Sequence, residues 1–238
     1  MTLTTLLLIT LAVAIGATVQ GAVGFGLGLV AVPLLLFIYP QCVPGPMLLA
    51  AVCLTTLLTY REWHSITMSD LKWTLGGRVA GIAAAALALT VVPEGRLDLF
   101  LAVLVLVGVA LSASGLRVVV TPKTLLGAGV LSGFMATTAA IGGPPVALLY
   151  QREPGPRLRG TLSAFFVVGA AMSLVGLHFV GRFGLEEAKL AMVMVPGVLL
   201  GFVLSRRLAS VLDRGALRSA VLVISALAAI GVVVRDLL

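Results

Sequence analysis

The chain has 238 residues, of which 60% are hydrophobic and 11% are charged. Soluble domains usually contain about 45–50% apolar and about 25% charged residues. This composition therefore excludes an ordinary soluble protein and predicts an all-α polytopic membrane protein. The net charge of +7 comes from 16 Lys and Arg against 9 Asp and Glu. Because these cations lie in short segments between apolar runs, we interpret them as orientation signals and expect no nucleic-acid partner.

Eight apolar runs follow one another along the chain, most of them near the roughly 20 residues that cross a lipid bilayer. In chain order they cover residues 3–38, 43–60, 73–92, 97–116, 124–150, 159–181, 188–205 and 215–234. The first run lacks a basic N-terminal region and continues well beyond residue 30. We therefore expect it to belong to the mature protein and not to a signal peptide.

Helix breakers interrupt the first and the fifth run. As one helix, residues 3–38 would measure about 54 Å, whereas the hydrocarbon core is only about 30 Å thick. This run contains "QGAVGFGLGLVAVPLLL" at residues 20–36, and the fifth run contains "AIGGPPVALLY" at residues 140–150. Proline suits the first turn of a helix. We predict that the chain turns back at Gly142–Gly143 and that a short helix begins near Pro144.

The two interrupted runs match each other at an offset of 112 residues. At this offset Gly21 aligns with Gly133, and Pro33 aligns with Pro145. A second pair of similar stretches starts at Gly76 and Pro196. We therefore predict two homologous halves, residues 1–120 and 121–238, that together form one membrane domain. Each half would contain a Gly/Pro-broken helical hairpin plus three transmembrane helices, as in many secondary transporters.

Loop charges distinguish hairpins from single crossings. If both interrupted runs cross once, the 16 Lys and Arg divide evenly between the two sides. If both double back, only four lie on the minority side: Arg96, Arg182, Lys189 and Arg235. Cytoplasmic loops carry the excess of Lys and Arg, so hairpins are favoured, the halves are inverted and both termini are outside. We expect Arg78, inside the third span, to reach the interface; attraction of an anion is the alternative.

Broken helices also predict where a ligand binds. The N-terminus of a half-helix carries partial positive charge and unpaired N–H groups, which suit an anion. We therefore predict a substrate site near the membrane midplane, formed by Gln20, Gly21, Gly24, Gly26, Gly28, Ser132, Thr137, Thr138, Gly142, Gly143, Pro144 and Pro145. The alternative for the Ser and Thr side chains is a bond to their own backbone, and for the glycines close helix packing.

Several kinds of chemistry have no support in the sequence. No carboxylate lies in the middle of a span, which argues against a cation pathway or a carboxylate proton relay. Cys42 and Cys53 have no metal-site or disulfide spacing, and no catalytic motif appears. We expect no catalytic residues, no metal and no cofactor. The partners we expect are the lipid bilayer and a small anionic substrate, while a proton or sodium coupling ion and a homo-oligomer stay open.

Three stretches resemble the sulfite exporter TauE/SafE family: "GAVGFGLGLVAVPLLL", "SGFMATTAAIGGPPVALLY" and "VPGVLLGFVLSRRLASVLDRGALRSAVLVISALAAIG". The resemblance covers nearly the whole chain and implies a small inner-membrane permease for sulfur-containing or organic oxyanions. The family's motifs fall on Gly21, Gly24, Gly26, Gly28, Pro33, Gly133, Gly142, Gly143, Pro144 and Pro145. The second motif departs from the first, since Ala136 and Ala140 stand where the first half has Gly24 and Gly28.

We therefore expect a secondary transporter, a permease or exporter, for a small oxyanion such as sulfite or an organosulfonate. It would work by alternating access around a midplane site between the two Gly/Pro motifs. An anion channel is the first alternative, and a membrane scaffold subunit without transport is the second.

Overall fold

A computed structural model describes residues 1–67, 71–211 and 214–237, without the side chains of residues 94, 209–221, 236 and 237. The secondary structure of the described residues is all helical, with loops between the helices, as predicted. Their α-helices are α1 (Leu3–Val23), α2 (Leu27–Ile38), α3 (Gly45–Arg61), α4 (Leu71–Val91), α5 (Leu97–Ala113), α6 (Pro122–Ala139), α7 (Gly143–Tyr150), α8 (Gly155–Phe179), α9 (Leu185–Val211) and α10 (Arg214–Leu237). Short 3-10 helices follow α2, α3 and α4, at Pro40–Cys42, Trp63–Ser65 and Glu94–Arg96.

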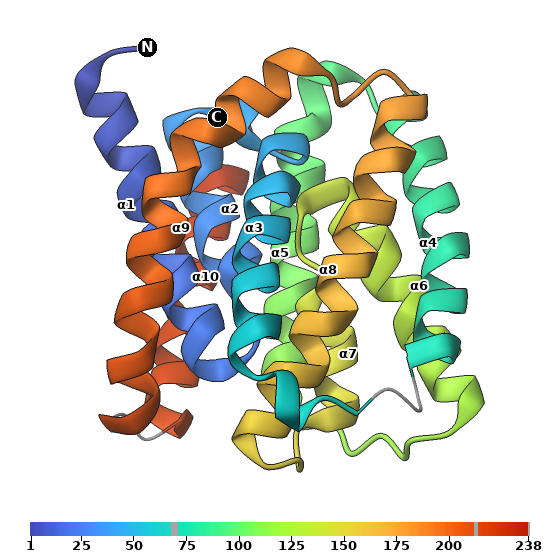
Figure 1. The fold of residues 1–238 in the computed structure, drawn as a ribbon. Coiled ribbons are helices and arrows are strands. Elements are labelled where there is room, and N and C mark those ends of the chain that lie inside the picture. Colours follow the sequence, from blue (N-terminus) through green and yellow to red (C-terminus); the bar gives the residue numbers. More distant parts are fainter. Residues whose placement is uncertain (68–70, 212–213, 238) are drawn as a thin grey trace.

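Both interrupted runs double back. The first run breaks into α1 and α2, which pack against each other, and the fifth breaks into α6 and α7, which do the same. The two hairpins enter the helix bundle from opposite ends (Figure 1). Each remaining predicted run is a single helix whose ends lie within a few residues of the predicted limits.

The two chain termini lie at the same end of the bundle (Figure 1). At this end, Met1 shares a surface hollow with Tyr39 and Glu186, and Arg235 donates a hydrogen bond of 2.9 Å to Asp98 Oδ2. We call it the terminal end. The opposite end, which we call the loop end, joins α3 to α4, α5 to α6 and α7 to α8. This arrangement agrees with the hairpin topology, and the side of the membrane that each end faces stays a prediction.

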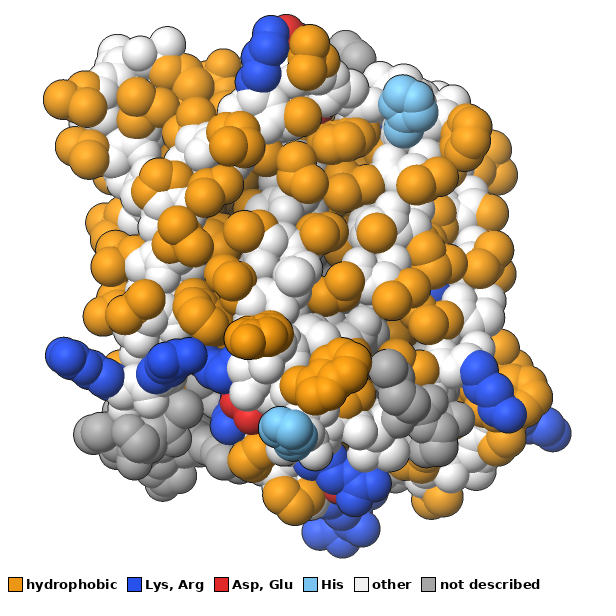
Figure 2. Space-filling view, viewed as in Figure 1, with side chains coloured by type: hydrophobic (Ala, Val, Ile, Leu, Met, Phe, Trp, Pro, Cys, Tyr) orange, Lys and Arg blue, Asp and Glu red, His pale blue; other side chains and the backbone are white. Residues whose placement is uncertain are grey.

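On the face shown in Figure 2, hydrophobic side chains cover a broad band, and basic side chains gather near the loop end. Four helices are long and apolar enough to cross a membrane, at Leu3–Val23, Leu71–Val91, Gly155–Phe179 and Leu185–Leu208. Together with the apolar surface, they identify a multi-pass membrane protein. Asp70 and Asp213 lie outside the described residues, and the side chains of Arg214 and Arg218 also lie outside the description.

Glycine brings two pairs of helices into backbone contact. On α4, Gly77 and Gly81 face the carbonyl oxygens of Leu126 and Val130 of α6. The contact is reciprocal, because Gly129 and Gly133 of α6 face carbonyl oxygens of α4. The second pair is α9 and α1, where Gly197 and Gly201 of α9 face the backbone of α1. Small residues at such positions allow helices to approach closely within a membrane.

A larger side chain at the α4–α6 contact should therefore separate the two helices. In Gly81→Leu, the new Cβ would meet the Val130 carbonyl and the Phe134 backbone nitrogen, neither of which can move aside as a flexible side chain does. We expect a clear drop in the thermal midpoint of the detergent-solubilised protein, matching an overpacking cost of about 1–3 kcal/mol or more. Gly127→Leu is the matched control, since nothing lies within 4 Å of its Cβ position. Equal midpoints for the two variants would contradict this account of the contact.

Candidate functional site

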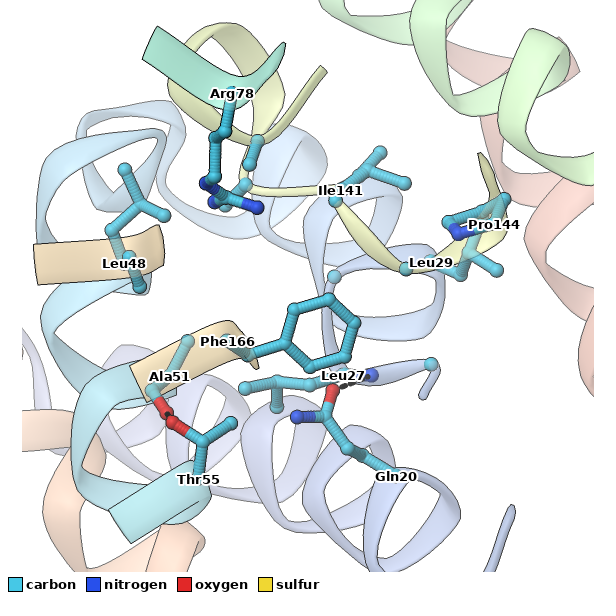
Figure 3. A pocket seen from close by; sticks show the side chains of 17 residues that line it. Gln20, Leu27, Leu29, Leu48, Ala51, Thr55, Arg78, Ile141, Pro144 and Phe166 are labelled. Carbon is cyan, nitrogen blue, oxygen red and sulfur yellow. Dashed lines mark hydrogen bonds between the residues drawn. The ribbon is translucent and has the colours of Figure 1, made fainter. Parts of the chain in front are cut away.

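A cavity of about 40 Å³ lies where the tips of the two hairpins meet inside the bundle (Figure 3). This volume holds roughly two or three water molecules. Its polar side chains are Gln20, Thr55 and Arg78, and most other lining side chains are apolar, including Leu48 and Phe166. The full lining comprises Gln20, Gly26, Leu27, Gly28, Leu29, Leu48, Ala51, Thr55, Arg78, Ala136, Ala140, Ile141, Gly142, Gly143, Pro144, Phe166 and Ala170.

The first tip is shaped by glycine and capped by Gln20. Gly24 and Gly26 have φ of 107° and 129°, a left-handed backbone that glycine adopts without strain. The chain can therefore leave α1 and start α2 within three residues. Gln20 Oε1 accepts a hydrogen bond of 3.1 Å from the Leu27 N–H. Gly28 and Leu29 also line the cavity. Their N–H groups have no partner within the helix because they belong to its first turn.

The second tip turns at a residue that we did not predict. Ala140 has φ of 56°, whereas Gly142 is right-handed and caps α7, which begins at Gly143. The break between α6 and α7 covers residues 140–142, so the predicted Gly142 lies within it, whereas Gly143 is already the first residue of α7. The short helix begins within one residue of the expected position. Gly142 and Gly143 serve instead in close packing and in the first turn of α7.

Prolines limit the donors that α7 can offer. Pro144 and Pro145 occupy the second and third positions of this helix, and proline has no backbone N–H. Of the first-turn donors, only those of Gly142 and Gly143 remain. The first turn of α2, which contains no proline, therefore has more backbone N–H groups than the first turn of α7, where we had placed the start of the anion site.

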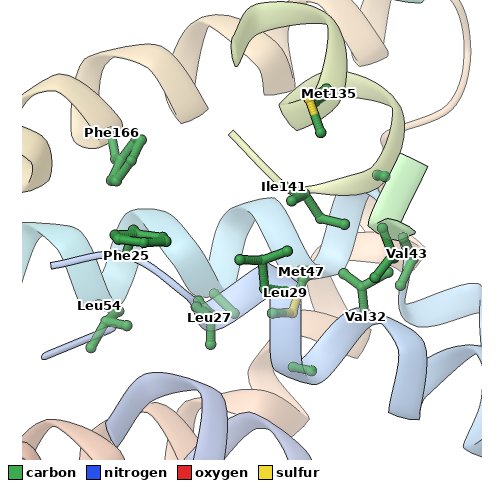
Figure 4. Close-up of a cluster of buried hydrophobic side chains, with 14 of the residues drawn as sticks. Phe25, Leu27, Leu29, Val32, Val43, Met47, Leu54, Met135, Ile141 and Phe166 are labelled. Atoms are coloured by element: carbon green, nitrogen blue, oxygen red, sulfur yellow. The ribbon is translucent and has the colours of Figure 1, made fainter. Parts of the chain in front are cut away.

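The tips touch each other through glycine. A Cβ at Gly28 would collide with the carbonyl oxygen of Ala140, and one at Gly143 would lie 2.8 Å from Phe25 Cβ. Around this contact, buried side chains of both hairpins form one apolar cluster with Phe166 of α8 (Figure 4). The expectation that the two tips lie together inside the bundle is confirmed.

Arg78 lies inside the bundle, whereas we had expected its side chain to reach the membrane interface. It is 1% exposed, so the prediction that it reaches the membrane interface was wrong. Its Nη1 donates to Ser132 Oγ at 2.9 Å and its Nη2 to Ser173 Oγ at 3.4 Å, and its Cζ lies 5.0 Å from the Phe165 ring centre. Gly169 makes room for the head group, because a Cβ there would collide with it.

The cavity includes some of the predicted site residues and not others. It is lined by Gln20, Gly26, Gly28, Gly142, Gly143 and Pro144. Ser132 stands just behind, donating to the Gly142 carbonyl at 2.6 Å, and Thr137 donates to Ser173 at 2.9 Å. Thr138 bonds its own helix at Phe134 O, the alternative we had weighed. The remaining three, Gly21, Gly24 and Pro145, are absent from the lining.

A polar network lies between the cavity and the loop end. Arg61 donates to the Gly21 carbonyl at 2.6 Å and to Ser205 Oγ at 2.9 Å. Glu62 Oε1 accepts from Arg61 at 3.3 Å and from Arg159 at 3.0 Å. We call Arg61, Glu62, Arg159 and Ser205 the loop-end network. It joins α1, α3, α8 and α9, and sequence reasoning had treated its arginines as orientation signals only.

A second cavity, of about 400 Å³, lies at the terminal end. It is lined by the start of α3, Leu89, Leu97, Asp98 and Arg182. Among the described residues, no group of three or more His, Cys, Asp and Glu side chains could hold a metal ion.

A cavity between two broken helices in a bundle of membrane-spanning helices is an arrangement that many secondary transporters share. The family model described as sulfite exporter TauE/SafE matches residues 8–232, so the chain belongs to this family. Its members are transporters and not enzymes, and membership implies export of sulfite or a related anion. The comparison with curated proteins gave no match, and the comparison with solved structures gave none either.

Gln20 allows the ligand chemistry of the cavity to be tested without removing the cap of α2. In Gln20→Glu, a carboxylate oxygen can still accept the Leu27 N–H, but the amide donors are replaced by negative charge at the cavity wall. We expect anion transport to fall by about tenfold or more, because a like charge lies beside the anion, while the thermal midpoint changes little. Gln20→Met, which has no charge and no cap, should instead lose about 1 kcal/mol of stability. Undiminished transport in Gln20→Glu would remove Gln20 from the site.

Proposed function

We propose that the protein is a secondary transporter of a small oxyanion, and that its substrate is a sulfur compound such as sulfite or an organosulfonate. Membership of the sulfite exporter TauE/SafE family supports the substrate class. The observation that carries the mechanism is the cavity between the two hairpin tips, which offers backbone N–H groups, an amide and an arginine. Its volume of about 40 Å³ suits a small ion better than a large organic molecule.

We further propose that residues 1–120 and 121–238 are inverted repeats. The support is the pattern of helix packing. The first helix of each half lies along the fourth helix of the other half, so that α1 packs on α9 and α6 packs on α4. The third helices, α3 and α8, pack on each other, as do the last helices, α5 and α10. A two-fold relation between the halves explains all of these pairs at once.

Alternating access then has a physical basis in the difference between the two ends of the bundle. The loop-end network ties four helices together just beyond the cavity, whereas the terminal end has the large second cavity. We interpret this as the state in which the loop end is closed. Opening that end would require the Arg61 and Arg159 contacts to separate.

Flux measurements in liposomes test the function. We expect saturable uptake of sulfite or a short sulfonate that competes with related anions and depends on a coupling ion or an exchanged anion. Conductance without saturation or coupling would identify an anion channel instead. The absence of binding and flux for sulfite, sulfate, thiosulfate and short sulfonates would contradict the transporter and favour a scaffold subunit.

In the same assay, Gly143→Leu should abolish flux, because its side chain would enter the contact between the two tips. The protein should still insert into the membrane, since the other helices are unchanged. Gly127→Leu, which meets open space, is the control and should retain the flux. Normal flux in Gly143→Leu would show that the second tip is not part of the path.

The proposed location is the inner membrane with both termini outside, because the loop end carries most of the cations. Arg78 is buried inside the bundle and is therefore left out of the count of cations at the two ends. The hairpin topology then places 11 Lys and Arg at the loop end and 4 at the terminal end, which still favours the loop end as cytoplasmic. A reporter active only in the cytoplasm, fused after Leu238, should therefore be inactive. The same reporter inserted after Arg117, in the exposed segment between α5 and α6, should be active. The opposite pattern would reverse the orientation.

A further inference from the structure

Arg78 is a buried cation whose partners are all neutral. Its hydrogen bonds go to two serines, and none of the ion pairs among the described residues involves it. An arginine side chain stays protonated in proteins, so the positive charge remains. A charge inside a membrane protein is costly unless it is paired. The serines orient the guanidinium but cannot neutralise it.

The guanidinium has donors to spare and a cavity in front of it. It carries five N–H donors in a planar fork, and the two serines use two of them. The Nε atom has no hydrogen-bond partner among the described residues. Arg78 lines the cavity and its side chain points into it (Figure 3). Forked donors of this kind match the paired oxygens of an oxyanion.

We propose that the Arg78 guanidinium is the charged group that binds the transported oxyanion, and that the site therefore takes a singly charged anion. This inference rests on the proposed transport function. Ser132 connects the charge to the second tip, since it accepts from Arg78 and donates to the Gly142 carbonyl. Binding at Arg78 is thereby linked to the position of that tip. Ser132 and Ser173 are positioning residues in this arrangement.

The limit to one negative charge follows from the other groups around the cavity. Among the described residues, the lining includes no acidic side chain and no second basic one. The α2 N-terminus adds only a fraction of a unit charge, and apolar walls such as Leu48 and Phe166 add none. A monoanion would neutralise Arg78. A dianion would keep uncompensated charge in surroundings that cannot solvate it, which is strongly unfavourable.

Sulfite offers a test in the unmodified protein, because hydrogensulfite and sulfite differ by one proton and interconvert near neutral pH. We expect the affinity for total sulfite to fall as pH rises, approaching about tenfold per pH unit once the monoanion is the minor form. The affinity for methanesulfonate, which stays a monoanion, should be constant over the same range. Sulfate, a permanent dianion of similar size, should bind about tenfold or more weaker than methanesulfonate.

The outcomes separate this inference from the proposed function. Sulfate binding as tightly as methanesulfonate, or sulfite affinity that does not fall with pH, would overturn the charge limit while leaving anion transport in place. No binding or flux of any of these anions would overturn the transport function itself. A matching fall in methanesulfonate affinity would place the titration in the protein and also overturn the charge limit.

Variants of Arg78 test whether this residue supplies the positive charge that binds the anion. Arg78→Gln should weaken methanesulfonate binding by about 100-fold or more, and Arg78→Lys should restore part of it with the same preference over sulfate. Arg117→Gln removes one positive charge from an exposed position and should leave binding unchanged. A folded Arg78→Gln protein with unaltered methanesulfonate affinity would overturn the assignment. If Arg78→Gln does not fold, the pH test in the unmodified protein still decides the charge limit.

Discussion

Unpaired backbone groups at the ends of broken helices are the constraint on which the rest of the structure depends. In a membrane interior no water is available for them, so protein groups or a hydrated cavity must satisfy them. At the first tip, Gln20 accepts the Leu27 N–H. At the second tip, Ser132 donates to the Gly142 carbonyl and the Ile141 N–H bonds back to Met135. Proline in the first turn of α7 reduces the number of donors that need partners.

The groups that satisfy the breaks also account for part of the polarity of the cavity. Gln20 can cap α2 only if it lies beside the first tip, and this position places its amide at the cavity wall. Ser132 can reach the Gly142 carbonyl only from the inner face of α6, and the same position lets it hold Arg78. The Gln20 amide and the Ser132 hydroxyl therefore have structural roles at the breaks. In the proposed transport function, an anion would use donors that the breaks already require.

Sequence reasoning located the helices, the two breaks and the doubling back, because hydrophobic runs, Gly/Pro clusters and loop charges each report local physics. It also located six of the residues that line the cavity. It failed where the answer depends on which helices are neighbours. Arg78 lies about two turns into α4, where a surface position would let it reach the interface, and only the packing of α6 and α8 around it decides otherwise. Its hydrogen-bond partner Ser173 is a single serine within an apolar run, and no sequence pattern marks it as part of the site.

The turn at Ala140 has a related explanation. A left-handed backbone is uncommon for alanine, so the neighbouring glycines were the natural candidates. In the structure, Gly28 approaches the Ala140 carbonyl, and Gly143 approaches Phe25, so glycine is needed for the contact between the tips. Glycine could serve here either to allow a left-handed backbone or to allow close contact between the tips. In this structure the glycines are at the contact positions, and alanine takes the left-handed position.

Backbone contact through glycine also defines two closely packed pairs of helices. The α4–α6 and α1–α9 pairs are joined along their backbones, so each pair should behave as a rigid unit. Arg78 and Ser132 both belong to the α4–α6 pair, whereas Gln20 belongs to the α1–α9 pair. An anion in the cavity would therefore lie between the two units. In the proposed alternating-access cycle, the charge and the second tip move together as one unit, and the first tip moves with the other. The loop-end network joins α1 and α9 to α3 and α8, so in this cycle it would restrain the α1–α9 unit against α3 and α8.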